Sequence, residues 1–145
     1  MRLYLDSSVV RRCVDGTASE RQTSIGWIKK AANSPTGTIL VSKLVRAECL
    51  VMPYRNRDNA LVERFESVFR ENGIVLVSIS DEILELATRI FADYGVKMAD
   101  AIHTATAVLG QCDALVAKDE PWTKKGSILG LRLIAFSDHS AADNL

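Results

Sequence analysis

The amino-acid sequence predicts a three-layer α/β/α domain with a five-stranded parallel sheet. Five short apolar runs recur along the 145 residues, and most of them do not alternate apolar with polar residues. Such runs are typical of strands that are covered on both faces. Helical patterns separate the runs, and strands that alternate with helices form parallel sheets with helices on both faces. The five expected strands lie at residues 3–5, 39–41, 74–79, 114–117 and 131–136.

Capping residues and apolar spacing predict the main helices. Ser80 is a good N-cap for a helix that Gly95 ends. Similar signals predict a helix over residues 59–72, and Ser42 can cap another. A further helix over residues 98–109 is so rich in Ala, Thr and apolar residues that we expect it to be largely buried.

Length and composition fit a single domain over residues 1–145. The chain has 18 basic and 18 acidic residues, and 48% of its residues are hydrophobic. This balance excludes a disordered chain and a polycation that binds nucleic acid by bulk charge alone. The apolar runs are far shorter than a membrane span, and the N-terminus lacks a signal-peptide pattern. We therefore expect a cytoplasmic protein with no membrane association, whose three cysteines are reduced thiols.

Acidic residues are expected at the edge of the sheet where the strands end. In open α/β sheets the site lies beyond the carboxyl ends of the strands. Asp6 directly follows the first strand, and Asp119 comes two residues after the fourth. Glu48 lies within the apolar stripe of Leu44, Val45, Val51 and Met52 on its helix, where a carboxylate is costly unless a cation pairs with it. Asp100 lies near the start of the buried helix, where a capping or dipole role would also explain it.

Four carboxylates without a cysteine are a hard set of ligands, which suits Mg²⁺ or Mn²⁺ rather than zinc. Basic residues lie close to these acids in the sequence, and they could hold an RNA backbone or be ordinary solvated side chains. The candidates for RNA binding are Lys43, Arg46, Lys97 and Lys118. We expect His103 to be a helix-packing histidine with a local hydrogen bond rather than a ligand. Trp122 is expected to pack in its loop rather than to stack on a base.

Four motifs in series resemble those of the PIN domain family. They are YLDSSVV at residues 4–10, VRAECL at 45–50, VKMADAIH at 96–103 and LVAKD at 115–119. The similarity covers essentially the whole chain, and VapC-type toxins of toxin–antitoxin pairs are the most similar in style. The resemblance implies a Mg²⁺-dependent endoribonuclease that hydrolyses RNA by metal-activated water. It also implies that the catalytic and metal-binding residues are Asp6, Glu48, Asp100 and Asp119.

The same resemblance implies further features of the site and its partners. Ser8 would be a supporting hydroxyl that helps to orient Asp6. Mn²⁺ would be a possible substitute for Mg²⁺, and a small antitoxin protein and a second copy of the chain would be partners. The fourth motif departs from the family, since Ala117 stands where Thr or Ser is common. Glu120 could assist or partly replace Asp119.

Three other functions are alternatives to this one on the sequence. A PIN-like fold without catalysis would bind RNA or protein as a scaffold. A receiver-like signalling domain would accept phosphate on an aspartate, but it needs an adjacent pair of acids where this chain has only Asp6. A haloacid-dehalogenase-like phosphatase would need a second aspartate at the position of Ser8.

Overall fold

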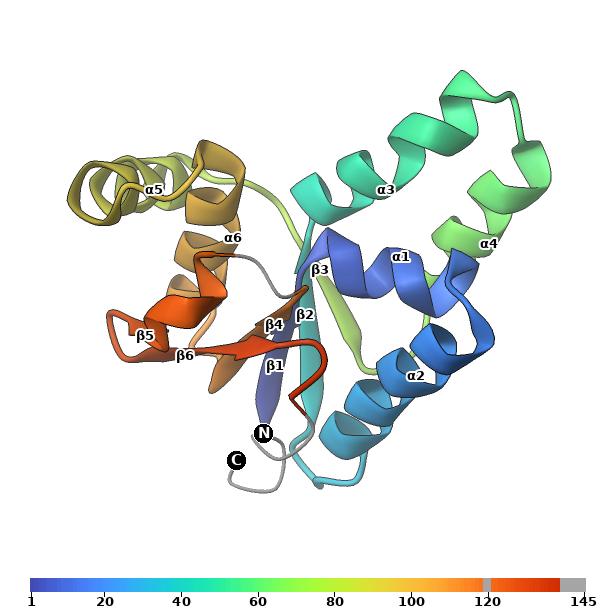
Figure 1. The fold of residues 1–145 in the computed structure, drawn as a ribbon, viewed down its shortest axis with the longest axis horizontal. Helices are drawn as coiled ribbons and strands as arrows, with labels where there is room; N and C mark the ends of the chain where they lie inside the picture. Colours follow the sequence, from blue (N-terminus) through green and yellow to red (C-terminus); the bar gives the residue numbers. More distant parts are fainter. Residues whose placement is uncertain (119–120, 139–145) are drawn as a thin grey trace.

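A six-stranded sheet organises the computed structural model, which describes residues 1–118 and 121–138 (Figure 1). The strands are β1 (Arg2–Leu5), β2 (Thr38–Ser42), β3 (Ile74–Val77), β4 (Ala114–Ala117), β5 (Ser127–Ile128) and β6 (Leu131–Ala135). Their order is β3-β2-β1-β4-β6-β5, and every neighbouring pair is parallel except β5 with β6. The five parallel strands confirm the predicted sheet. The antiparallel β5 has only two residues, too few to form a recognisable apolar run.

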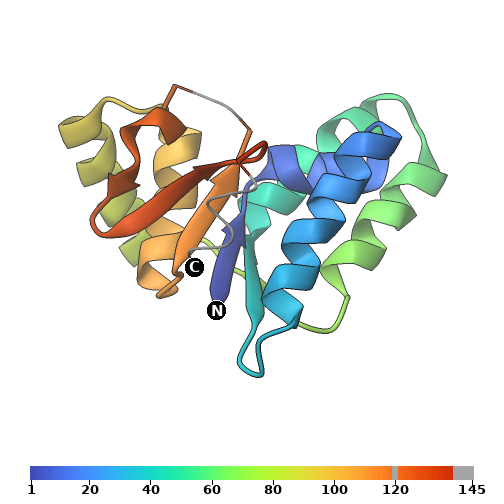
Figure 2. The ribbon, with the colours of Figure 1, turned by 60° about the horizontal axis from the view of Figure 1, so that its bottom comes forward.

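Helices cover both faces of the sheet and complete the three layers (Figures 1 and 2). One face carries α1 (Ser7–Asp15), α2 (Ala18–Ala32), α3 (Lys43–Arg55) and α4 (Asn59–Phe69), and the other carries α5 (Asp81–Tyr94) and α6 (Met98–Leu109). A short 3₁₀-helix, η1 (Thr123–Lys125), precedes β5. In the described part of the chain, no helix combines the length and apolar character that crossing a membrane requires.

Local chemistry at the helix ends agrees with most of the predicted boundaries. The Ser80 side chain accepts a hydrogen bond from the backbone N–H of Ile83, and Gly95 ends α5 in the left-handed conformation at φ 66°. The predicted helix over residues 59–72 is too long, because α4 ends at Phe69. The chain tightens there, where the backbone N–H of Arg70 bonds to a carbonyl only three residues earlier.

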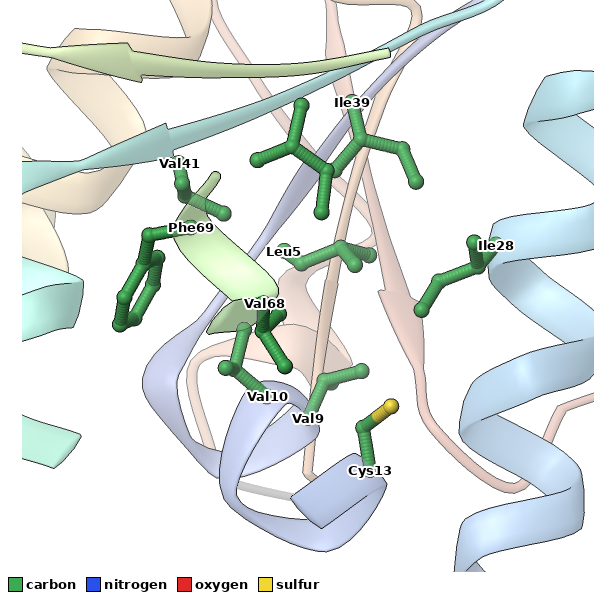
Figure 3. Close-up of a pocket in the computed structure, with 10 residues that line it drawn as sticks. Leu5, Val9, Val10, Cys13, Ile28, Ile39, Val41, Val68 and Phe69 are labelled. Atoms are coloured by element: carbon green, nitrogen blue, oxygen red, sulfur yellow. The ribbon is translucent and has the colours of Figure 1, made fainter. Parts of the chain in front are cut away.

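The core is continuous between the sheet and the helices. Leu3, Tyr4 and Leu5 of β1 are at most 2% exposed, and Trp27 and Phe65 are also buried. A cavity of about 10 Å³ lies between the sheet and helices α1, α2 and α4, and Figure 3 shows side chains that line it. It is lined by apolar side chains and the thiol of Cys13, with room for about one water molecule and no polar group to hold one. This cavity is therefore a packing void rather than a binding site.

The strand order decides where functional side chains meet. Strand β1 lies between β2 and β4, and it pairs with each of them in parallel. Helices α1 and α3 begin directly after β1 and β2, and α6 packs against β2 and β4 from the opposite face. The start of α1, the first two turns of α3 and the middle of α6 therefore approach one another at the carboxyl ends of the central strands.

Candidate metal centre

Three side chains from distant parts of the chain converge at this edge of the sheet. Asp6 is the N-cap of α1, Glu48 lies in the second turn of α3, and His103 lies in the middle of α6. One ligand atom from each side chain lies within 4.8 Å of the corresponding atoms of the other two. Such a cluster of two carboxylates and an imidazole could hold a metal ion.

Neighbouring groups orient Asp6 through one of its two oxygens. Its Oδ2 atom accepts a hydrogen bond of 2.7 Å from the Ser8 hydroxyl and another of 3.4 Å from the Ser8 backbone N–H. The Ser8 oxygen in turn accepts a hydrogen bond of 3.0 Å from the backbone N–H of Lys118, just after β4. Ser8 therefore joins the ends of β1 and β4, and it leaves Oδ1 of Asp6 to face the other two side chains. The sequence-based placement of Ser8 beside Asp6 agrees with these contacts.

Glu48 lies at the border of the buried face of α3 rather than within it. The sequence placed it in a stripe with Val51 and Met52, but each of these residues is 48% exposed. The buried residues of α3 are Val45, Cys49, Leu50 and Pro53. The Glu48 side chain is 32% exposed, so it reaches from the protein interior toward solvent. The predicted stripe was therefore wrong at Val51 and Met52 and right at Val45, and His103 meets the need for a partner at Glu48.

The contacts of His103 are long-range, which corrects the expectation of a local hydrogen bond. Its Nε2 atom lies 2.6 Å from Oε1 of Glu48 and 3.2 Å from Oδ1 of Asp6. Its Nδ1 atom lies 2.7 Å from the hydroxyl oxygen of Tyr4, a residue 99 positions away in the sequence. The His103 side chain is 1% exposed. The only sequence signal was a titratable residue on an otherwise apolar helix, and that signal does not identify the partners.

The electrostatics of the cluster favour positive charge. Burial lowers the pKa of His103, but the hydrogen bond with Glu48 and the charges of Asp6, Glu48 and Asp100 outweigh it and hold the pKa above its usual value. Burial raises the pKa of Tyr4 well above its usual range, so its hydroxyl keeps its proton. The same negative potential that stabilises a protonated imidazole would attract a metal cation.

The remaining predicted acids, Asp100 and Asp119 with Glu120, are not part of this cluster in the described residues. Asp100 lies in the first turn of α6, one turn before His103, and is half-buried. It is outside the cluster of three, although its charge acts on His103. It borders a pocket together with Lys97, Trp122 and other residues. Asp119 and Glu120 lie outside the described residues.

The predicted RNA-binding residues differ in their solvent exposure and in their contacts with other side chains. Lys43, Lys97 and Lys118 are exposed. Arg46 instead makes two contacts with Glu66 of α4, at 2.6 and 3.2 Å, and so joins α3 to α4. Trp122 is only 4% exposed, as expected for packing within its loop. The exposed lysines are therefore better placed than Arg46 to bind a phosphate of RNA.

The donor atoms fit a divalent cation. Carboxylate oxygens are the preferred protein ligands of Mg²⁺ and Mn²⁺, and an imidazole nitrogen is also a ligand for Mn²⁺ and later transition metals. In the described residues the cluster offers two such oxygens and one such nitrogen. Its partial exposure at Glu48 leaves one side of the cluster open to solvent or substrate.

Comparison with known proteins gives one family and several similar structures. A model of the family described as the PIN domain matches residues 3–126. No curated protein matches the chain. VapC20 from Mycobacterium tuberculosis, described as a Sarcin-Ricin loop cleaving toxin, is 14% identical with a TM-score of 0.69, over 90% of this chain and 98% of that one.

Two other solved structures have the same arrangement. VapBC2 from Rickettsia felis, bound to a DNA fragment from its promoter, is 16% identical with a TM-score of 0.69, covering 93% of this chain and 98% of that one. A toxin–antitoxin complex from Klebsiella pneumoniae is 19% identical with a TM-score of 0.68, covering 89% of this chain and 94% of that one. At these identities the likeness shows a shared fold.

Proposed function

Because the chain belongs to the PIN domain family, as its four motifs predicted, we propose that it is a Mg²⁺-dependent endoribonuclease and the toxin of a VapBC-type pair. The observation that carries this proposal is the convergence of Asp6, Glu48 and His103 within 4.8 Å at the carboxyl edge of the sheet. The shared fold with the toxin of Mycobacterium tuberculosis supports it. A scaffold without catalysis would have no need to concentrate carboxylates in this way.

Asp6 and Glu48 would hold the cation through their facing oxygens. Asp100 and Asp119 are proposed as further ligands. Once bound, a divalent cation would activate a water molecule for attack on phosphorus and would neutralise charge on the leaving oxygen. Ser8 would keep Asp6 in its binding orientation by donating to the oxygen that does not face the cluster.

The exposed lysines would hold the RNA backbone next to the acids. Lys43 begins the helix that carries Glu48, Lys97 is the N-cap of the helix that carries Asp100, and Lys118 follows β4. Cations placed beside an acidic site position a polyanion without neutralising the acids themselves. Arg46 would contact phosphate only by giving up its two contacts with Glu66.

The proposed partners are a small antitoxin protein and a second copy of the chain. Support for the antitoxin comes from the similar structures, one of which is a VapBC2 assembly and another a toxin–antitoxin complex. The exposed apolar residues Leu84 and Phe91 of α5 offer surface for such contacts. The proposed location of the protein is the cytoplasm, and Mn²⁺ is proposed as a substitute for Mg²⁺.

Cleavage of RNA with and without metal tests this function. We expect purified protein to cut single-stranded or structured RNA with Mg²⁺ and to stop when EDTA is added. Asp6→Asn and Asp100→Asn should each lower the rate by roughly 100-fold or more, because loss of even a group that supports a metal ligand costs about 10–100-fold. Glu85→Gln, an exposed position on α5, is the matched control and should keep the rate.

The outcome also separates the alternatives. Cleavage that survives EDTA, or that survives both aspartate substitutions, would refute the metal mechanism. RNA binding without cleavage, unchanged by metal, would favour the scaffold instead. Co-purification from the native operon without a small partner, and expression without a growth defect, would count against the toxin–antitoxin role.

A further inference from the structure

We propose that His103 is itself a ligand of the metal, with Nε2 as a nitrogen donor beside the oxygens of Asp6 and Glu48. The resemblance to the PIN family implied carboxylates alone, and the sequence predicted a packing role for this histidine. The inference rests on the proposed metal centre, but it does not depend on RNA cleavage. Three features of the structure support it: the position of Nε2, the hydrogen bond on the other side of the ring, and the depth of the side chain.

Nε2 lies near the spacing of a shared coordination sphere from Asp6, and slightly closer than that spacing to Glu48. It is 3.2 Å from Oδ1 of Asp6 and 2.6 Å from Oε1 of Glu48. Adjacent ligand atoms around an octahedral ion with bonds of about 2.1 Å lie about 3.0 Å apart. An ion that is bound by both carboxylates would therefore lie within reach of Nε2 as well. Coordination would replace the hydrogen bonds that Nε2 donates to the two carboxylates, and the Nε2 proton would be released to solvent.

The opposite side of the ring is anchored as in metal-binding histidines. The Tyr4 hydroxyl donates its single proton to Oγ of Ser42 over 2.8 Å, and its oxygen lies 2.7 Å from Nδ1 of His103. Because Tyr4 has no second proton, Nδ1 must be the donor in that contact. Nδ1 therefore keeps its hydrogen, and Nε2 is the nitrogen that can offer a lone pair to a cation once its own proton has left. Metal-binding histidines commonly donate their second ring N–H to a fixed acceptor in this way.

The acceptor is itself held rigidly. Oγ of Ser42 also accepts a hydrogen bond of 3.2 Å from the backbone N–H of Val45, in the first turn of the helix that carries Glu48. Tyr4 and Ser42 are completely buried, and the His103 side chain is 1% exposed. The imidazole therefore forms the floor of the site and cannot turn away toward solvent.

A nitrogen donor changes which ions the site prefers. Mg²⁺ favours oxygen ligands, whereas affinity for imidazole rises from Mn²⁺ through Co²⁺ to later transition metals. We therefore expect the site to bind Mn²⁺ and Co²⁺ at least about tenfold more tightly than Mg²⁺. Replacing His103 with glutamine should reduce this preference, because the amide oxygen is a harder ligand than imidazole.

Pulsed electron paramagnetic resonance of bound Mn²⁺ tests the proposal directly. A coordinated imidazole couples its nitrogen nucleus to the manganese spin, and the coupling changes when ¹⁵N-histidine replaces natural histidine. We expect this coupling in the full-length protein with Mn²⁺ alone, without RNA. The chain has two histidines, so His139→Gln is the matched control that should retain the signal. His103→Gln should abolish it, with circular dichroism used to verify that the variant is folded.

Each result has a distinct meaning. Bound Mn²⁺ without histidine coupling in the unmodified protein overturns the proposal and leaves the carboxylate centre intact. Coupling that persists in folded His103→Gln also overturns it. If Mn²⁺ does not bind at all, both the proposal and the proposed metal centre fail. Coupling in a protein that cuts no RNA supports the ligand role and counts only against the nuclease function. Because the isotope comparison uses the unmodified protein, it shows whether a histidine binds the metal even if a variant folds poorly.

Discussion

Removing the hydroxyl of Tyr4 disturbs the buried hydrogen bonds that join the sheet to the metal site. Tyr4→Phe keeps the aromatic ring, and with it the packing of a side chain that is 0% exposed. The ring contact with His103, at 5.7 Å between centroids, should also survive. What is lost is the acceptor for Nδ1 of His103 and the donor to Oγ of Ser42.

The expected loss of stability follows from these two contacts. Ser42 retains the hydrogen bond from the backbone N–H of Val45, so its oxygen still has a partner. The Nδ1 donor of His103 would be buried without an acceptor, and an unsatisfied buried polar group costs about 1–3 kcal/mol. We therefore expect the free energy of unfolding to fall by about 1–3 kcal/mol. The melting temperature should fall by about 3–9 °C, at roughly 3 °C per kcal/mol for a chain of this size.

Urea unfolding followed by circular dichroism, in buffer with EDTA, measures this loss. Tyr54→Phe is the matched control, because Tyr54 is 59% exposed and its change should stay within about 0.5 kcal/mol. A double-mutant cycle with Ser42→Ala should give a coupling energy of about 0.5 kcal/mol or more. The reasoning is refuted if Tyr4→Phe destabilises the protein no more than Tyr54→Phe does. It is also refuted if the two buried substitutions are simply additive.

Four further substitutions test the packing of the fold. Gly26→Ala, inside α2 with no atom within 4 Å of the new Cβ, should raise the free energy of unfolding by about 0.5–1 kcal/mol in the same urea assay. Gly110→Ala should lower it by about 1–3 kcal/mol, since its Cβ would lie 2.4 Å from Cδ2 of buried Leu40; a neutral result would contradict the packing. Arg46→Ala and Glu66→Gln should show a coupling of only about 0.2–1 kcal/mol in a double-mutant cycle, because the Arg46 side chain is 40% exposed and solvent screens its charge. A much larger coupling would contradict this reasoning.

Local sequence was sufficient for most of the secondary structure. The cap at Ser80 and the glycine at position 95 determine where α5 begins and ends, because both act through hydrogen bonds and backbone conformation within one turn. The apolar runs likewise identified all five parallel strands. The prediction was less successful for Glu48, since helical spacing alone does not show which of several apolar stripes meets the sheet.

For the site, likewise, the sequence predicted local features but not the contacts between distant residues. The sequence placed Asp6 at a strand end, and the family resemblance implied that Ser8, two residues further on, supports it. Only the tertiary structure joins His103 to Glu48, 55 residues away, and to Tyr4, 99 residues away. A helical pattern records which residues share a face, but it does not record which face of another element lies opposite. The order of β2, β1 and β4 in the sheet decides which elements face one another. It places His103, for which the sequence predicted a packing role, in the candidate metal centre.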